Sequence, residues 1–232
     1  MSFFEVLFDA DAAEAGGVPV REYGGDPRWS GVAANFVESV DGVVALSGAT
    51  GESGAVVSGG SQADHFLMGL LRSCADAVLI GAGTLRAARR DLWTADSIFP
   101  AAADLYARVG RLRPRLYVVS ASGRVDPGLP ALRDGVLLTG KLPAQEILQR
   151  IRADGHQRIL CEGGPRLFAE LAAAGLLDAL FLTLSPRLFG RFEADGRKAL
   201  TDGRDLGGRE LVLRSVRRAG SHLFLRYGAR TT

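Results

Sequence analysis

The sequence has few of the residues that build disulfide frameworks and metal centres. Its 232 residues include two cysteines, Cys74 and Cys161, and three histidines that have neither close spacing nor suitable acidic companions. Two cysteines are too few for a disulfide scaffold or a cysteine-rich metal site, so a reducing, cytoplasmic location is expected. We expect no metal, and surface or packing roles for His65, His156 and His222.

Long hydrophobic runs are also absent. The most apolar stretch, residues 167–185, is broken by Glu170, Gly175 and Asp178. Each acid costs roughly 3 kcal/mol at the centre of a bilayer, so this stretch is not expected to span a membrane. The N-terminal residues are acidic and lack the basic start and apolar core of a signal peptide, so no export is expected.

Lysine is nearly missing, which leaves arginine to carry almost all of the positive charge. Lysine occurs only at Lys141 and Lys198, and the net charge is +2. The arginines are scattered among acids, which is typical of a solvated surface rather than a nucleic-acid-binding face. No segment repeats, which excludes solenoids and propellers. With 47% apolar residues, the chain is long enough to form one compact domain.

Short strand-like and helix-like segments alternate along the chain. Two strand-like runs near the C-terminus, residues 210–216 and 222–227, flank a turn rich in glycine and serine. They predict an antiparallel hairpin, whereas the alternation before them predicts an α/β fold, so the sheet should be mixed. The earlier strand-like runs occupy residues 32–39, 75–80, 116–120, 136–139, 158–161 and 179–184.

Three segments carry helix signals. Ser61 precedes Asp64 by three residues, a capping-box pattern that opens a helix ending near Arg72. Residues 144–151 place apolar side chains at i, i+3, i+4 and i+7. Pro165 suits the first position of a helix, because the missing N–H needs no partner there. We expect these helices to connect strands of the sheet.

Two glycine turns follow strand-like runs. Gly163-Gly164 lies just before Pro165, so its backbone could approach a ligand closely and the N–H groups of the helix could bind phosphate. A packing turn without a ligand explains the same residues. The second turn, Gly81-Ala82-Gly83-Thr84, resembles a dinucleotide-binding fingerprint only in part, because Arg86 occupies the place of the third glycine. Because ligands bind where strand ends converge in an open sheet, two such turns favour a binding site.

Two acids stand at predicted strand ends. Glu162 immediately precedes the Gly163-Gly164 turn, and a carboxylate repels phosphate, so it should face a different ligand or lie on the surface. Asp41 is followed by Gly42, which a turn explains without any function. The local sequence does not decide whether either acid has a structural or a catalytic role.

The order of several motifs is more specific than any one of them. The chain contains, in this order, Ser39-Val40-Asp41-Gly42, Leu71-Arg72, Gly81-Ala82-Gly83-Thr84-Leu85-Arg86, Glu162-Gly163-Gly164-Pro165-Arg166-Leu167 and Ser185-Pro186-Arg187-Leu188-Phe189-Gly190. This ordered set resembles the C-terminal reductase domain of bifunctional riboflavin-biosynthesis proteins, which has the dihydrofolate-reductase-like fold. The resemblance begins near residue 32, so residues 1–30 are expected to form an N-terminal extension and residues 31–228 a single reductase domain.

The resemblance implies a fold and a reaction. The fold is a three-layer α/β/α sandwich around a mixed, mostly parallel sheet, commonly in a homodimer. The usual reaction of the family uses NADPH to reduce the ribosyl group of 5-amino-6-(5-phosphoribosylamino)uracil to ribityl at carbon 1. Its partner is therefore a small phosphorylated heterocycle, with no nucleic acid or membrane involved.

The resemblance also implies the site residues. It implies that Glu162 is a catalytic residue and that Asp41 is a second one. It also implies that Ser53, Arg72 and Glu162 bind the substrate, and that Arg72 binds its sugar phosphate. Ser120 and Arg124 are candidates for the 2′-phosphate of NADPH. The implied cofactor contacts are Val37, Ala55, Gly83, Thr84, Ser120, Gly163, Gly164, Pro165, Arg166, Leu167, Phe168 and Ala169.

The chain departs from the family pattern at two places. Asn35 stands where the family often has lysine, and Ala87-Ala88-Arg89-Arg90 stands where Ala-Asp-Asn-Pro is usual. A reductase for another heterocycle, such as a dihydropterin, and a nucleotide-binding module without activity are therefore alternatives. The zinc-deaminase motifs His-x-Glu and Pro-Cys-x-x-Cys do not occur, so no deamination is expected.

Overall fold

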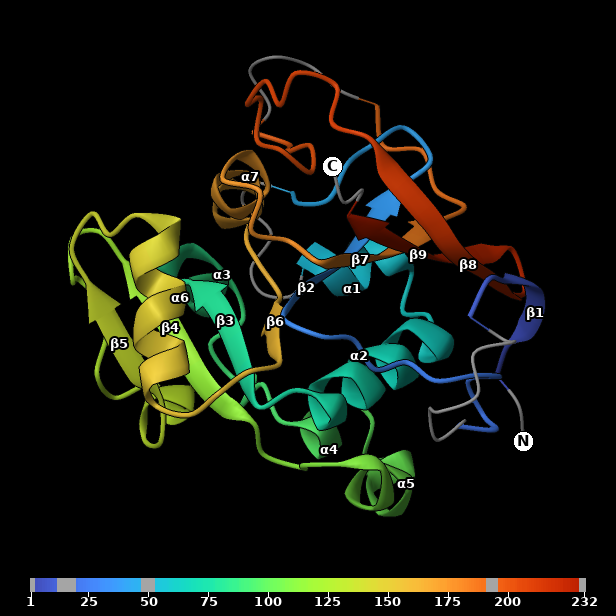
Figure 1. The fold of residues 1–232 in the computed structure, drawn as a ribbon, viewed down its shortest axis with the longest axis horizontal. Helices are drawn as coiled ribbons and strands as arrows, with labels where there is room; N and C mark the ends of the chain where they lie inside the picture. Colours follow the sequence, from blue (N-terminus) through green and yellow to red (C-terminus); the bar gives the residue numbers. More distant parts are fainter. Residues whose placement is uncertain (1–2, 12–19, 47–52, 191–195, 230–232) are drawn as a thin grey trace.

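A computed structural model describes residues 3–11, 20–46, 53–190 and 196–229. Within these residues, nine strands form one sheet in the order β1-β8-β9-β7-β2-β6-β3-β4-β5 (Figure 1). The strands from β7 to β5 run parallel, whereas β9, β8 and β1 continue the sheet antiparallel. The strands span Glu5–Asp9, Val32–Ser39, Ala77–Gly81, Arg115–Ser120, Val136–Thr139, Ile159–Cys161, Ala179–Ser185, Leu211–Ala219 and His222–Ala229, from β1 to β9.

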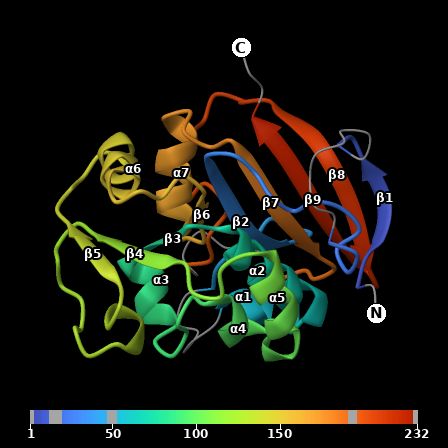
Figure 2. The ribbon, with the colours of Figure 1, turned by 60° about the horizontal axis from the view of Figure 1, so that its bottom comes forward.

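Helices cover both faces of the sheet (Figures 1 and 2). Helices α6 and α7 pack on one face, and α2 and α5 pack on the other. This arrangement is the predicted α/β/α sandwich with a mixed sheet. Among the described residues, no helix is long and apolar enough to cross a membrane. The helices span Ser53–Ser58, Gln62–Cys74, Ala82–Ala87, Ala95–Ile98, Ala103–Val109, Ala144–Ala153 and Pro165–Ala173, from α1 to α7, with 3-10 turns at Pro100–Ala102 and Pro130–Leu132.

The central strands are apolar at nearly every position because both of their faces are covered. In β3, Val78 and Ile80 pack into the core under α2, whereas Ala77 and Leu79 pack under α6 and α7. A strand buried on both sides gives a continuous apolar run instead of an alternating pattern. This explains why the parallel part of the sheet could be predicted from sequence.

Most of the predicted elements are confirmed, with small shifts at their ends. The strands at residues 32–39 and 136–139 have the predicted bounds, and the N–H of Asp64 donates to Oγ of Ser61 as a helix cap. The strand expected from residue 75 begins at Ala77, because the Asp76 carboxylate accepts the backbone N–H groups at residues 157 and 158 in a loop. The C-terminal hairpin is present as β8 and β9.

Residues 3–11 and 20–30, the described part of the first thirty, contribute to the same sheet and core. Strand β1 pairs antiparallel with β8, and Phe4, Tyr23 and Trp29 are buried in the core on the α2 face. The buried Arg217 on β8 donates to Asp9 at 2.6 Å, which fixes β1 to the hairpin. No strand was predicted here, and neither were the short helices α1, α3, α4 and α5.

Candidate active site

A pocket of about 1460 Å³ opens where the central parallel strands end. Residues of β2, β3 and β4 line it, together with the segments that follow β3, β4 and β6. Open α/β sheets bind their ligands at such carboxyl ends. A site for one drug-sized ligand usually has roughly 300–1,000 Å³, so this pocket has room for a larger ligand or for two.

The two glycine turns lie against each other in this pocket. The N–H of Gly81 donates to the carbonyl oxygen of Gly163 at 2.8 Å. Gly163 has a φ of 123°, a conformation that favours glycine. A Cβ atom at Gly163 or Gly164 would lie 3.2 or 3.3 Å from Oγ1 of Thr84, so a side chain there would crowd this hydroxyl. The predicted convergence of the two turns is confirmed.

The N-terminus of α7 points its backbone donors at the pocket. Gly164 is the N-cap and supplies no side-chain cap, and Pro165 occupies the first turn as predicted. The first N–H groups of a helix and the positive end of its dipole favour anions. Arg166 follows with a side chain that is 84% exposed. This edge of the pocket therefore suits phosphate.

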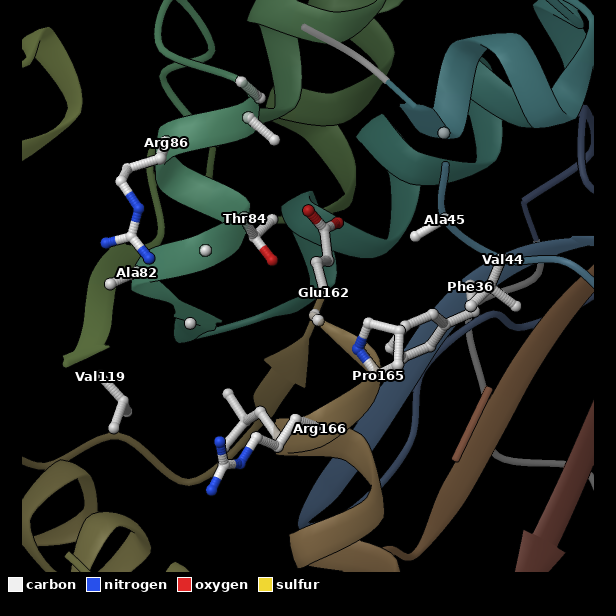
Figure 3. A pocket seen from close by; sticks show the side chains of 18 of the residues that line it. Phe36, Val44, Ala45, Ala82, Thr84, Arg86, Val119, Glu162, Pro165 and Arg166 are labelled. Atoms are coloured by element: carbon white, nitrogen blue, oxygen red, sulfur yellow. The ribbon is translucent and has the colours of Figure 1, made fainter. Parts of the chain in front are cut away.

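Two arginines of the pocket lie on one side of Glu162, and an aromatic ring lies on the other. Figure 3 shows Arg86 and Arg166 on one side of this carboxylate and Phe36 and Ala45 on the other. An elongated ligand with phosphates at one end and a flat, less polar ring at the other would match this distribution.

Glu162 is held by a buried arginine that bridges two carboxylates. Nε of Arg72 donates to both oxygens of Glu162 at 3.1 and 3.0 Å, and Nη2 donates to Oε2 at 2.8 Å. Nη1 and Nη2 also donate to Asp91 at 3.3 and 3.0 Å, and Nη1 reaches the carbonyl of Thr94 at 3.2 Å. The side chains of Arg72 and Glu162 are 1% and 5% exposed. Each of the three guanidinium nitrogens thus donates to a protein acceptor.

The charges in this cluster do not cancel. Burial raises the pKa of the Glu162 carboxyl, and Arg72 opposes that rise. Burial disfavours the charge on Arg72, but Glu162 and Asp91 outweigh it and raise the pKa of the guanidinium. One cation between two carboxylates leaves a net negative charge when both acids are ionised. The centre of the pocket therefore favours a reaction centre that becomes positive.

Comparison with protein families gives a match over most of the chain. Residues 31–225 match the family described as the RibD C-terminal domain. The chain belongs to this family. The match includes every strand that lines the pocket, and it confirms the predicted assignment to reductases of the riboflavin-biosynthesis type.

Solved structures share the fold of this RibD C-terminal domain. A pyrimidine reductase-like protein from Corynebacterium diphtheriae superposes with a TM-score of 0.66 at 22% identity, over 88% of this chain and 93% of that one. RibD from Acinetobacter baumannii gives 0.68 at 17% identity, over 86% and 58%. The riboflavin biosynthesis reductase Rib7 of Saccharomyces gives 0.56 at 14% identity, over 86% and 89%.

The chain spans a little over half of the Acinetobacter RibD protein but nearly all of the other two. No curated protein sequence matches it. The family assignment therefore depends on the family match, and the solved structures support the fold.

Most of the predicted cofactor residues of the RibD C-terminal domain lie on the pocket wall. Phe168 and Ala169 are buried and do not line it. The Phe168 ring packs in the core under α7, edge-on against Phe36 with centroids 5.2 Å apart. Those on the wall are Val37, Ala55, Gly83, Thr84, Ser120, Gly163, Gly164, Pro165, Arg166 and Leu167.

Some of the predicted substrate and catalytic residues line the pocket, and others do not. Arg72 and Glu162 line the pocket, whereas Asp41 and Arg124 are not among its lining residues. The Asp41 carboxylate accepts the Ser39 hydroxyl and two backbone N–H groups at residues 189 and 190, which lowers the pKa of Asp41 and ties the end of β2 to a loop. Ser53 begins α1, and its side chain lies outside the described residues.

Three acids that line the pocket, Asp64, Asp91 and Glu170, were not predicted as site residues. Asp91 comes three residues after Ala88, where the family pattern has an acid, and that displacement was the only available signal. Asp64 was interpreted as a helix-capping acid, yet it lines the pocket. In the described part of the chain, no group of histidines, cysteines and acids is suited to hold a metal ion.

Proposed function

We propose that this RibD C-terminal domain is an NADPH-dependent reductase that transfers a hydride to carbon 1 of the ribosyl group of a phosphoribosylamino-pyrimidine. The family substrate, 5-amino-6-(5-phosphoribosylamino)uracil, represents this class. The observation that carries the proposal is the position of Glu162. It is a buried carboxylate in one pocket, with Arg86 and Arg166 on one side of it and Phe36 on the other.

The residues of the pocket fit a dinucleotide. The glycine turns leave no side chain between the backbone and a ligand, and the helix start at Gly164 offers N–H donors to a pyrophosphate. We assign Arg86 and Arg166 to the phosphate side and Phe36 to the nicotinamide side. Ser120, which is 4% exposed and lines the pocket, remains the candidate for the 2′-phosphate.

The protein groups prepare the substrate for reduction. NADPH, when bound, supplies the hydride. As the ring of the ribosylamine opens to an imine, positive charge develops at carbon 1 and nitrogen, and the Glu162 carboxylate stabilises it. Opening breaks the bond between carbon 1 and the ring oxygen, and the proton of the amine nitrogen passes to that oxygen. When carbon 1 is reduced, the nitrogen would take up a proton from water in the pocket. Arg72 and Asp91 hold the carboxylate in place throughout.

This arrangement changes the proposed role of Arg72. Its donors already bind Glu162, Asp91 and Thr94, so we assign it to positioning Glu162 instead of gripping the sugar phosphate. Arg90 lines the pocket, is exposed and immediately precedes Asp91, so it is our candidate for the phosphate.

Purified protein should bind NADPH and oxidise it when the phosphoribosylamino-uracil is added. Fluorescence titration gives the affinities for NADPH and NADH, and the loss of absorbance at the nicotinamide band gives the rate. Dihydrofolate serves as the alternative substrate. Absence of NADPH binding would reject the proposal, and oxidation with dihydrofolate alone would select a pterin reductase.

Gly164→Asp should weaken NADPH binding by roughly 10- to 100-fold, because a carboxylate at the start of α7 repels phosphate and removes the advantage of the helix dipole. Gly164→Ala is the matched control, since it adds the same Cβ, 3.3 Å from the Thr84 hydroxyl, without the charge. The titration should show a much smaller loss for Gly164→Ala. Equal losses would mean that crowding, and not phosphate binding, explains the effect.

We also propose a homodimer in the cytoplasm. The homodimer is common in the family, and the two cysteines are free and buried, as a reducing compartment allows. Size-exclusion chromatography with light scattering measures the oligomeric state.

A further inference from the structure

Trp93 lines the pocket in a backbone conformation that is rare for a large side chain. Its φ is 52°, in the left-handed region, and apart from glycines only Asp202, in an exposed turn, shares this region among the described residues. Such a conformation is unfavourable for a bulky residue, and strain of this kind clusters at ligand-binding sites. At this turn of the backbone, Trp93 faces inward and is 2% exposed, while the neighbouring Leu92 points outward at 40%.

The contacts of the Glu162 cluster hold Trp93 in this conformation. The backbone N–H of Trp93 donates to Oδ1 of Asp91 at 2.8 Å, and the carbonyl oxygen of Thr94 accepts Nη1 of Arg72 at 3.2 Å. Asp91 also accepts Nη2 of Arg72, which in turn binds Glu162. The groups that position the Glu162 carboxylate therefore also fix the backbone of Trp93, yet the proposed mechanism leaves its indole without a role.

The indole N–H of Trp93 has no acceptor in the described part of the chain. Its Nε1 is not one of the buried polar atoms that lack a partner, so the edge of the ring that carries it opens into the pocket. The indole N–H of Trp29, outside this pocket, donates to the carbonyl oxygen of Gly31 at 3.2 Å. A buried tryptophan usually finds an acceptor for this group. For Trp93, a ligand in the pocket would supply it.

A cation that also lines the pocket lies three residues before Trp93. Arg90 is exposed and forms no ion pair with a described residue, whereas its neighbour Arg89 lies off the pocket and pairs with Asp126 at 2.9 Å. A carbonyl or hydroxyl oxygen of a ligand needs no cation beside it. A phosphate accepts charge-assisted hydrogen bonds from a guanidinium and also has oxygens for a neutral N–H. The Arg90 guanidinium and the Trp93 indole therefore match a phosphate.

We infer that the indole N–H of Trp93 and the guanidinium of Arg90 bind the phosphate of the substrate's ribosyl group. The inference rests on the proposed function, because it adds Trp93 to the residues that select a phosphorylated substrate. Carbon 1 of that group lies at Glu162, and carbon 5 with its phosphate extends toward the segment that Asp91 anchors. A substrate without the phosphate would leave the N–H of Trp93 without an acceptor.

The two tryptophans allow the binding to be measured without turnover. In Trp29→Phe, Trp93 is the sole indole, so its fluorescence should change when ribose 5-phosphate is added, with or without NADP⁺. In Trp93→Phe the remaining indole lies outside the pocket, and its fluorescence should not respond. Calorimetric titration of the unaltered protein gives the affinities independently of these variants. We expect ribose 5-phosphate to bind roughly 10- to 100-fold more tightly than ribose, the effect of hydrogen bonds to a charged group.

Trp93→Phe supplies the decisive comparison, because phenylalanine keeps most of the buried ring but has no donor. The dissociation constant for ribose 5-phosphate and the KM for the phosphoribosylamino-uracil should rise by roughly 3- to 10-fold, the effect of one neutral hydrogen bond. The kcat and the affinity for NADPH should stay unchanged, and the latter also shows that the variant is folded. Arg90→Met should weaken ribose 5-phosphate further. Arg89→Met, the same change one residue away and off the pocket, should keep the affinity of the unaltered protein.

The possible outcomes separate this inference from the proposed reaction. Phosphate-dependent binding that weakens in Trp93→Phe and Arg90→Met supports the inference even when no substrate is reduced, which would then reject only the reaction. Equal affinities for ribose and ribose 5-phosphate, binding of neither, or unchanged binding in Trp93→Phe would each overturn the inference. So would an equal loss in Arg89→Met, or a fall in kcat at unchanged KM in Trp93→Phe, which would assign Trp93 to the support of Glu162 instead.

Discussion

Arg72→Met should lower the free energy of unfolding by about 3–5 kcal/mol, the usual effect of removing one partner from a buried ion pair. The Arg72 side chain is 1% exposed and forms ion pairs with Glu162 at 2.8 Å and Asp91 at 3.0 Å. Methionine fills similar space but leaves the buried Glu162 charge without a partner. Urea unfolding followed by circular dichroism measures the loss.

The double variant Arg72→Met, Glu162→Gln separates the charge effect from a packing effect. Removing the Glu162 charge should restore part of the lost stability, because Asp91 is more exposed, at 18%, and can be solvated. Arg166→Met, at a side chain that is 84% exposed, should change stability little. A single Arg72 variant as stable as the unaltered protein would contradict the proposed network.

Glu162→Gln should reduce kcat on the order of 100- to 1,000-fold, the effect typical of losing one preorganised electrostatic group at a reaction centre. Glutamine keeps the size of the side chain but cannot balance a developing positive charge. The affinity for NADPH should stay within about twofold, since the phosphates bind at the other groups and not at this acid. Steady-state kinetics and fluorescence titration measure the two quantities separately.

The pH dependence of kcat provides a second test of the role of Glu162. The groups that act on Glu162 are Arg72, Asp91 and Asp64, and burial raises its pKa above that of an exposed glutamate. If the ionised form is the active one, kcat falls as the pH is lowered through this raised pKa. Glu162→Gln should lose that acidic limb. Loss of activity at high pH instead would make Glu162 a proton donor.

Glu170→Gln is the matched control for this experiment. Glu170 also lines the pocket, but its side chain is 36% exposed and pairs with Arg166 at 3.5 Å on the surface of α7. We expect near-normal kcat and an unchanged pH profile. A loss as large as that of Glu162→Gln would mean that the pocket responds to its overall charge and not to one positioned carboxylate.

The sequence was informative where neighbouring residues decide the structure. The helix starts at Ser61 and Pro165 depend on residues within one turn, and both are confirmed. The continuous apolar runs of the parallel strands depend only on burial on both faces. The convergence of the turns at Gly81 and Gly163 follows from the rule that parallel strands end at one edge, and the hydrogen bond between them confirms it.

The short elements were not predictable in this way. Strand β1 has only five residues and gains its stability from pairing with β8, more than two hundred residues later in the chain. Helices α3 and α4 have six and four residues, too few for a repeating apolar stripe. Their formation depends on the surfaces they pack against.

The sequence by itself determined the fold class, the mixed sheet and the glycine turns, because periodicity, caps and turn residues act over a few neighbouring positions. Only the tertiary structure decided the partners of the acids. Arg72, Asp91 and Glu162 lie far apart in the sequence and meet because α2, the segment after α3 and the end of β6 pack together. A buried charge takes its role from the groups packed around it, and local sequence does not specify those groups.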